Sequence, residues 1–190
     1  MKAYNIMIVG VGGQGTLLAS RLAGAVAMEA GYDVKVSEVH GMSQRGGSVV
    51  TYVRIGEKVY SPLITKGGAD IILAFELLEA ARWLPYLKPG GKLIVNTQQM
   101  DPMPVVIGSA EYPQGLEEAL NQRCGDVEQM DALSLAVESG TAKAVNVVLI
   151  GAMARHLPFE KEAWRKAIRD IVPEKFRSVN LTAFDKGYGV

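Results

Sequence analysis

The hydrophobic positions along the chain follow two patterns, short apolar runs and longer amphipathic stretches. Residues 4–10 (YNIMIVG) form an apolar run that ends in glycine, which is typical of a strand buried on both faces. Residues 16–31 carry apolar side chains at helical spacing, and Gly31 is placed to end that helix. The same patterns predict strands at 33–39, 69–75, 92–97, 103–108 and 126–132, and helices at 76–87, 115–124, 142–157, 160–172 and 173–189.

Residues 48–64 (SVVTYVRIGEKVYSPLI) have the pattern of a β-hairpin. β-branched residues lie on either side of Gly56, and Pro62 is placed to end the second arm. Because strands alternate with helices through most of the chain, the fold class predicted is α/β. We expect a three-layer, Rossmann-like domain with a mixed, mainly parallel sheet and one β-hairpin. No repeat or linker is visible, so residues 1–190 are predicted to form one domain.

The charge balance limits the partners that the chain can attract. Lys and Arg together number 20, as do Asp and Glu, so the formal net charge is zero. A neutral chain has no broad field for nucleic acid or an anionic membrane, and we expect neither as a partner. No run approaches the ~18 apolar residues that span a bilayer, and the N-terminal residues lack a signal-peptide pattern. A cytoplasmic location is expected.

Cys124 is the only cysteine. An internal disulfide is therefore impossible, and so is an iron–sulfur cluster or zinc site held by several cysteines of this chain. We expect Cys124 to be a small, semi-buried apolar residue.

Residues 10–15 (GVGGQG) satisfy the pattern G-x-G-x-x-G between a strand and a helix. Glycines permit a tight turn, and the free N–H groups at the start of the helix favour an anion. A dinucleotide site would also need an acid near the end of the second strand, where Glu38 stands. Alternatively, the glycines serve packing alone. Gln14 is unusual for a dinucleotide turn, and its amide could contact a ligand or a second chain.

Residues 40–47 (HGMSQRGG) form a second glycine-rich segment. Three glycines in one loop suggest unusual dihedral angles or a close contact. Arg45, with the backbone N–H groups that follow it, could form a small anion pocket. His40 could donate a proton to a ligand, or it could simply be solvated.

Four further polar residues lie close to predicted strand ends or in helices. Glu76 and Glu79 follow the strand at 69–75, where acids favour a helix N-terminus and Glu76 could also contact a partner. Asn96 and Asn146 are expected to hydrogen-bond a loop backbone.

Taken together, GVGGQG and SEVHGMSQRGGSV resemble the gamma-type domain of the 2-oxoacid:ferredoxin oxidoreductases. The resemblance continues through VYSPLI, GGADIILAFELLEAARWLPYLKPGGKLIVNT, NVVLIGA and VNLTAFDKG, and so covers nearly the whole chain. The segment EVHGMSQRGG resembles the indolepyruvate (aryl-pyruvate) branch of this family, in its beta-subunit form.

The resemblance implies a subunit of an enzyme that oxidatively decarboxylates a 2-oxoacid to an acyl-CoA and reduces ferredoxin. This chain lacks the G-D-G…N-N segment that binds thiamine diphosphate, and it has one cysteine. Thiamine diphosphate, Mg²⁺ and the iron–sulfur clusters are therefore expected in a larger alpha subunit, through which ferredoxin contacts the complex. The chain alone is expected to be inactive.

The resemblance also implies a coenzyme A site shared with the alpha subunit, where a coenzyme A phosphate or the substrate carboxylate would bind. The residues predicted to bind it are Gly12, Gly13, Gln14, Gly15, Arg45, Gly46, Gly47 and Ser48. The residues predicted at the partner contact or pocket edge are His40, Gly41, Met42, Ser43 and Gln44. We assign this chain no metal ligand and no catalytic residue.

Two alternatives stay open from the sequence. One is a free-standing NAD(P)-dependent dehydrogenase that uses residues 10–15 and Glu38, although no Tyr/Lys or Lys/His set follows them. The other is a Rossmann-like scaffold that binds an alpha subunit without completing its site. An apolar interface left without its partner would also allow the isolated chain to form a homodimer.

Overall fold

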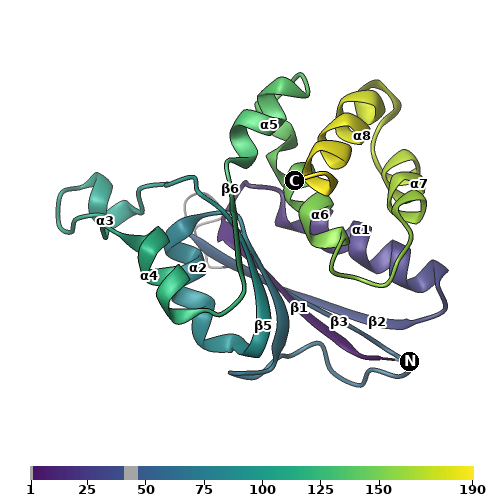
Figure 1. Ribbon diagram of the computed structural model, residues 1–190, viewed down its shortest axis with the longest axis horizontal. Coiled ribbons are helices and arrows are strands. Elements are labelled where there is room, and N and C mark those ends of the chain that lie inside the picture. The colour runs from purple at the N-terminus through teal and green to yellow at the C-terminus, as the bar shows by residue number, and fades with distance from the viewer. Residues whose placement is uncertain (1, 41–46) are drawn as a thin grey trace.

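A six-stranded sheet forms the centre of the molecule, with the strand order β2-β3-β1-β4-β5-β6 (Figure 1). The computed structural model describes residues 2–40 and 47–190. The strands are β1 (Tyr4–Val11), β2 (Asp33–His40), β3 (Ser48–Gly56), β4 (Ala69–Ala74), β5 (Leu87–Asn96) and β6 (Val127–Met130). β1, β4, β5 and β6 pair in parallel, whereas β3 runs antiparallel to both of its neighbours, β1 and β2. The predicted mixed, mainly parallel α/β sheet is confirmed.

Helices cover both faces of this sheet (Figure 1). One face is covered by α2 and α4, and the other by α1 and α5 to α8. The helices are α1 (Thr16–Glu29), α2 (Leu77–Trp83), α3 (Met103–Val106), α4 (Leu116–Arg123), α5 (Ala132–Glu138), α6 (Val145–Ala154), α7 (Lys161–Ile171) and α8 (Glu174–Tyr188), with 3-10 turns η1 (Leu84–Tyr86) and η2 (Ala142–Ala144).

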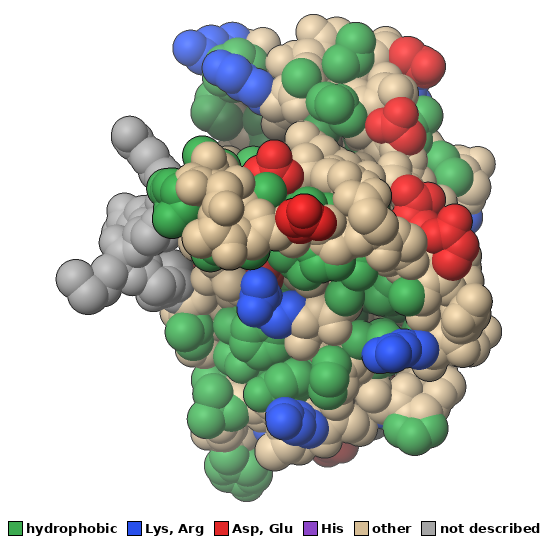
Figure 2. Space-filling view, turned by 90° about the vertical axis from the view of Figure 1, so that its left-hand side faces the viewer, with side chains coloured by type: hydrophobic (Ala, Val, Ile, Leu, Met, Phe, Trp, Pro, Cys, Tyr) green, Lys and Arg blue, Asp and Glu red, His purple; other side chains and the backbone are tan. Residues whose placement is uncertain are grey.

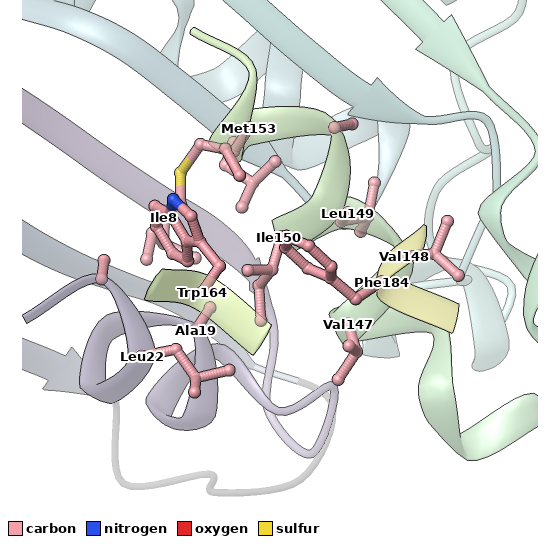
Figure 3. Packing of buried hydrophobic residues seen from close by; sticks show 14 of the residues in the cluster. Ile8, Ala19, Leu22, Val147, Val148, Leu149, Ile150, Met153, Trp164 and Phe184 are labelled. Atoms are coloured by element: carbon pink, nitrogen blue, oxygen red, sulfur yellow. The ribbon is translucent and has the colours of Figure 1, made fainter. Parts of the chain in front are cut away.

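Alternating side chains of β1 divide the core into two parts. Ile6 and Ile8 face the helices of the larger layer, while Met7 and Val9 face α2 and α4. In the larger core, Trp164 of α7 stacks on Phe184 of α8 with ring centroids 6.4 Å apart. Figure 3 shows these rings together with side chains of α6, which is buried from Asn146 to Ala154. A helix without a polar face must lie between other layers, and α6 does so.

The β-hairpin lies elsewhere than predicted. Residues 48–56 form one strand, β3, but residues 57–68 form no second arm. Instead, β3 pairs with β2 along its whole length, so that the hairpin arms are 33–40 and 48–56. Residues 41–46, which come between these arms in the sequence, lie outside the described residues. The prediction failed because β-branched content marks a strand but not its partner.

Two short helices also differ from the prediction. Residues 103–106, predicted as part of a strand, form α3, because Pro102 and Pro104 cannot donate the hydrogen bonds of a ladder. Met103 and Val106 are exposed there. α5 was not predicted, although Asp131 caps it by accepting a hydrogen bond from the Ser134 N–H (3.0 Å).

Candidate functional site

The two glycine-rich segments meet at one edge of the sheet. Val11, the last residue of β1, pairs with Ser48, the first residue of β3. Beyond this pair, the Gly12 N–H donates a hydrogen bond to the Gly47 carbonyl oxygen at 2.9 Å. Predicted site residues that are far apart in the sequence are thus neighbours in the structure.

Part of the predicted site cannot be placed. Gly41, Met42, Ser43, Gln44, Arg45 and Gly46 lie outside the described residues. His40 is the last residue of β2, and its backbone pairs with Val49. Its side chain is not among the parts that the structure describes.

The turn after β1 needs its glycines for geometry. Gly15 is the N-cap of α1 and has φ 87°, in the left-handed region. A Cβ atom there would lie 2.5 Å from Nδ2 of Asn146, which donates a long hydrogen bond (3.5 Å) to the Gly15 carbonyl oxygen. Gly13 has φ 100° and faces open space. The N–H groups of Gly13 and Gly15 find no acceptor within residues 2–40 and 47–190, so this turn can still receive an anion.

Gln14 connects two strand ends of the same sheet. Its Oε1 accepts a hydrogen bond from the Val11 N–H (2.7 Å), and its Nε2 donates to the Phe75 carbonyl oxygen (3.1 Å). Gly10 leaves room for this side chain, because a Cβ atom at position 10 would lie 2.7 Å from that Oε1. Gln14 therefore has a structural role, and its contact with a ligand or partner stays a prediction.

Asn96 extends this network to β5. Its Nδ2 donates to the same Phe75 carbonyl oxygen (3.2 Å), and its Oδ1 accepts from the Ala132 N–H (3.1 Å). The carboxyl ends of β1, β4 and β5 are joined through one carbonyl group. Asn96 bonds to the loop backbone at Phe75 and Asn146 bonds to it at Gly15, so the expectation for both residues is confirmed.

Glu76 is a buried carboxylate (1% exposed) directly after β4. Its Oε2 accepts from the Glu79 N–H (2.9 Å) and so caps α2. Its Oε1 accepts from the Met100 N–H (3.1 Å) and from the Tyr112 hydroxyl. Burial, followed by this bond to the carboxylate, raises the pKa of Tyr112 well above its usual value. Glu76 thus bonds to one residue before α3, Met100, and to one after it, Tyr112.

Glu79 lies beside the start of β3 and is also buried (4% exposed). Its Oε2 accepts from the Ser48 hydroxyl and from Nε1 of Trp83 (3.3 Å), and its Oε1 accepts from Nε of Arg82 (3.1 Å). The side chain of a predicted site residue, Ser48, is therefore oriented by an acid that the sequence indicated only as a helix-terminus residue. The signal available was its position three residues after Glu76, in the first turn of the helix that follows β4.

The order of strands separates Glu38 from the glycine turn. In dinucleotide-binding Rossmann folds the second strand lies directly beside the first. Here β3 lies between β1 and β2, so Glu38 is two strands away, about 10 Å at the usual strand spacing. This geometry disfavours the dehydrogenase alternative.

The face of the molecule on the side of α3 has no dominant charge. The face in Figure 2, on the side of α3, mixes basic, acidic and hydrophobic side chains without a continuous basic field. Within residues 2–40 and 47–190, no cluster of three or more His, Cys, Asp or Glu residues could hold a metal ion. No helix in the same part of the chain is long and apolar enough to cross a membrane.

Known proteins are similar to this chain over nearly its whole length. Residues 5–190 match the model of the family described as pyruvate ferredoxin/flavodoxin oxidoreductase. A protein of Pyrococcus horikoshii named indolepyruvate oxidoreductase subunit IorB is 47% identical over 98% of this chain and 95% of its own length. A protein of the same name from Thermococcus kodakarensis is 46% identical over the same shares.

Solved structures of similar fold carry related descriptions. A keto/oxoacid ferredoxin oxidoreductase gamma subunit from Geobacter sulfurreducens has a TM-score of 0.72 and is 26% identical, over 98% of this chain and 96% of that one. The 2-oxoglutarate:ferredoxin oxidoreductase of Magnetococcus marinus, solved with 2-oxoglutarate, coenzyme A and succinyl-CoA, has a TM-score of 0.73 at 22% identity. It covers all of this chain, which spans only 31% of that larger one.

Proposed function

The chain belongs to the pyruvate ferredoxin/flavodoxin oxidoreductase family, and from this membership we propose that it is the small subunit of an indolepyruvate oxidoreductase. The observation that carries the proposal is 47% identity to a protein of that name across nearly the full length of both chains. The keto/oxoacid ferredoxin oxidoreductase gamma subunit from Geobacter sulfurreducens is only 26% identical to this chain. The difference supports the aryl-pyruvate branch over other 2-oxoacids.

The proposed reaction is the oxidative decarboxylation of an aryl-pyruvate to an acyl-CoA, with reduction of ferredoxin. Thiamine diphosphate, Mg²⁺ and iron–sulfur clusters would reside in a larger alpha subunit, since this chain has a single cysteine. The Magnetococcus marinus enzyme supports this arrangement, because a domain of this fold is less than a third of that chain. Residues 1–190 would act as one gamma-type domain, in the cytoplasm, inactive without the partner.

The proposed contribution of this chain is one side of a coenzyme A site. The open N–H groups of Gly13 and Gly15 lie at the turn that bonds to Gly47. Arg45, three residues before Ser48, whose hydroxyl group Glu79 orients, would add a positive charge to this site. A guanidinium and backbone N–H groups together suit a phosphate or carboxylate. The contact with the alpha subunit or the edge of the pocket would be formed by His40, Gly41, Met42, Ser43 and Gln44.

Reconstitution tests the proposed function. We expect the complex of both subunits to reduce a viologen dye when given indolepyruvate and coenzyme A. The alpha subunit alone should lose this activity, whereas a scaffold role would leave measurable turnover once the alpha subunit is kept folded. Faster turnover with pyruvate or 2-oxoglutarate than with indolepyruvate would contradict the assigned substrate class.

A single substitution tests the coenzyme A site. Arg45→Ala should raise the apparent KM for coenzyme A about tenfold, the value of one charge-assisted contact, while the KM for indolepyruvate stays unchanged. Lys66→Ala, an exposed charge elsewhere, is the matched control. Unchanged kinetics in Arg45→Ala would exclude the phosphate role, and a raised KM for indolepyruvate alone would assign Arg45 to the substrate carboxylate.

A further inference from the structure

A cavity of about 880 Å³ lies between α1, the connection from α5 to α6, and the start of α8. The residues that line it come from three separate parts of the chain, around Leu18, Thr141 and Phe176. Its volume is within the range of about 300–1,000 Å³ that small-molecule sites occupy. The cavity is separate from the proposed coenzyme A site, because none of the described residues predicted to bind coenzyme A lines it. Asn146 lines the cavity and bonds to Gly15, so it lies between the cavity and the glycine turn.

The lining is positively charged. Arg21, Lys143 and Lys175 all line the cavity, and no Asp or Glu does. Elsewhere on these helices, cations are paired: Lys186 with Glu138, and Arg165 with Asp185. By contrast, neither Arg21 nor Lys143 forms an ion pair within the described part of the chain. A concave surface lined by one sign of charge concentrates its field and attracts the opposite charge.

The start of α8 adds to this field. The helix has 15 residues, and its N-cap, Pro173, offers no side-chain acceptor to the N–H groups of the first turn. Pro173 and Lys175 both line the cavity whereas Glu174, the acid of this first turn, does not, so the positive end of the helix faces the same space.

An apolar wall lies beside these charges. Leu18, Ile171, Val172 and Phe176 line the cavity, and Phe176 is 47% exposed although it is aromatic. The Lys175 Nζ lies 4.8 Å from the centroid of that ring, so a cation and an aromatic face are presented together. This combination suits a ligand with an anionic end and an apolar or planar end.

We propose that this cavity binds a phosphorylated organic molecule of the nucleotide class. Its phosphates contact Arg21, Lys143, Lys175 and the N-terminal turn of α8, and its planar part lies against Phe176. The proposal does not depend on the identity of the oxoacid. The same chemistry is offered by a free nucleotide and by the nucleotide part of coenzyme A, and the experiment distinguishes them.

Calorimetric titration of the full 190-residue chain with ADP, coenzyme A and inorganic pyrophosphate tests the proposal. We expect ADP, coenzyme A or both to bind, with pyrophosphate about tenfold weaker because it lacks the apolar part. The variant Arg21→Ala/Lys143→Ala/Lys175→Ala should raise the Kd at least about tenfold. The control Lys2→Ala/Lys58→Ala/Lys66→Ala removes the same charge from exposed positions that do not line the cavity.

The outcomes of these titrations either identify the ligand or overturn the proposed site. Binding of ADP and coenzyme A alike, weakened by the cavity variant, supports a nucleotide site. Binding of coenzyme A alone, weakened by the same variant, identifies the ligand as that molecule. Equal weakening by both triple variants would mean that only the overall charge matters, which overturns the proposal. The same holds if none of the three compounds binds at millimolar concentration, or if the cavity variant loses only its assembly with the partner subunit.

Discussion

Glu76 shows how a single side chain can have a role that its position in the sequence does not reveal. An acid after a buried strand suggests a helix N-terminus, and Glu76 does cap α2. The structure adds two donors from further along the chain, the Met100 N–H and the Tyr112 hydroxyl. A buried carboxylate is tolerated only when its oxygens accept hydrogen bonds, and here they do.

Replacing this carboxylate should be costly. Glu76→Ala removes the cap and leaves Met100 and Tyr112 with unpaired polar groups, so we expect a loss of about 3 kcal/mol in the free energy of unfolding. Urea denaturation measures it. Glu174→Ala, in the exposed first turn of α8, is the control and should change stability by less than about 0.5 kcal/mol. Similar losses in both variants would show that Glu76 acts only through the helix dipole.

Tyr112 predicts how stability changes at alkaline pH. Its pKa in the folded chain is raised by burial and by the bond to Glu76, above the unfolded value of about 10. The protonated hydroxyl therefore stabilises the fold below about pH 10, and this contribution is lost as the pH rises from there toward the folded-state pKa. Tyr112→Phe should be less stable at neutral pH but lose stability less steeply above about pH 10.

The control for Tyr112 is the exposed Tyr60 (84% exposed). Tyr60→Phe should leave the wild-type pH dependence of unfolding unchanged. If Tyr112→Phe follows the same alkaline curve as the wild type, the hydroxyl of Tyr112 does not titrate with unfolding.

At the scale of elements, the hydrophobic patterns predicted which segments form strands and helices, but not which strands pair with each other. The apolar run of β1 and the β-branched run of β3 both predicted strands that exist. The second arm of the hairpin is not the segment that follows β3 but the strand before it, β2. Pairing is decided by cross-strand packing and turn geometry, which a local pattern does not contain.

The crossing of α6 and α8 gives a prediction at this scale. A Cβ atom on Gly187 would lie 1.9 Å from the carbonyl oxygen of Val148, so Gly187→Ala must push the two helices apart. We expect a loss of about 3 kcal/mol, because both helices belong to a closely packed core. Gly189→Ala, where the nearest atom is 3.4 Å away, should be nearly neutral. Thermal unfolding compares the two, and equal midpoints would contradict the close approach.

At the scale of the molecule, the order of strands decides between functions. A glycine turn and an acid at the end of the next strand satisfy a dinucleotide pattern, but β3 separates β1 from β2. The two groups that should share one nucleotide are therefore not on adjacent strands. Membership of an oxidoreductase-subunit family agrees with this geometry.

NADH should consequently leave the stability of the chain unchanged once the charged cavity is removed by Arg21→Ala/Lys143→Ala/Lys175→Ala. A ligand at 100 times its Kd stabilises a native protein by about 2.7 kcal/mol, which is roughly 5–10 °C for a chain of this size. Scanning fluorimetry of this variant with millimolar NADH should show no such shift in the melting temperature. A clear shift that Glu38→Ala abolishes would support the dehydrogenase alternative instead.

The chain by itself determined the α/β class, the positions of β1, β2, β4, β6 and the main helices, and the family, because periodicity, turn residues and motifs are local properties. Only the tertiary structure decided the partner of β3, the internal bonds of Gln14, the buried roles of Glu76 and Glu79, and the charged cavity beside α8. Each of these includes a contact between residues far apart in sequence, such as the bond from Gln14 to Phe75. Which polar groups then meet is set by how the elements pack, and a polar residue in a sequence shows what it can bond to but not what lies within reach.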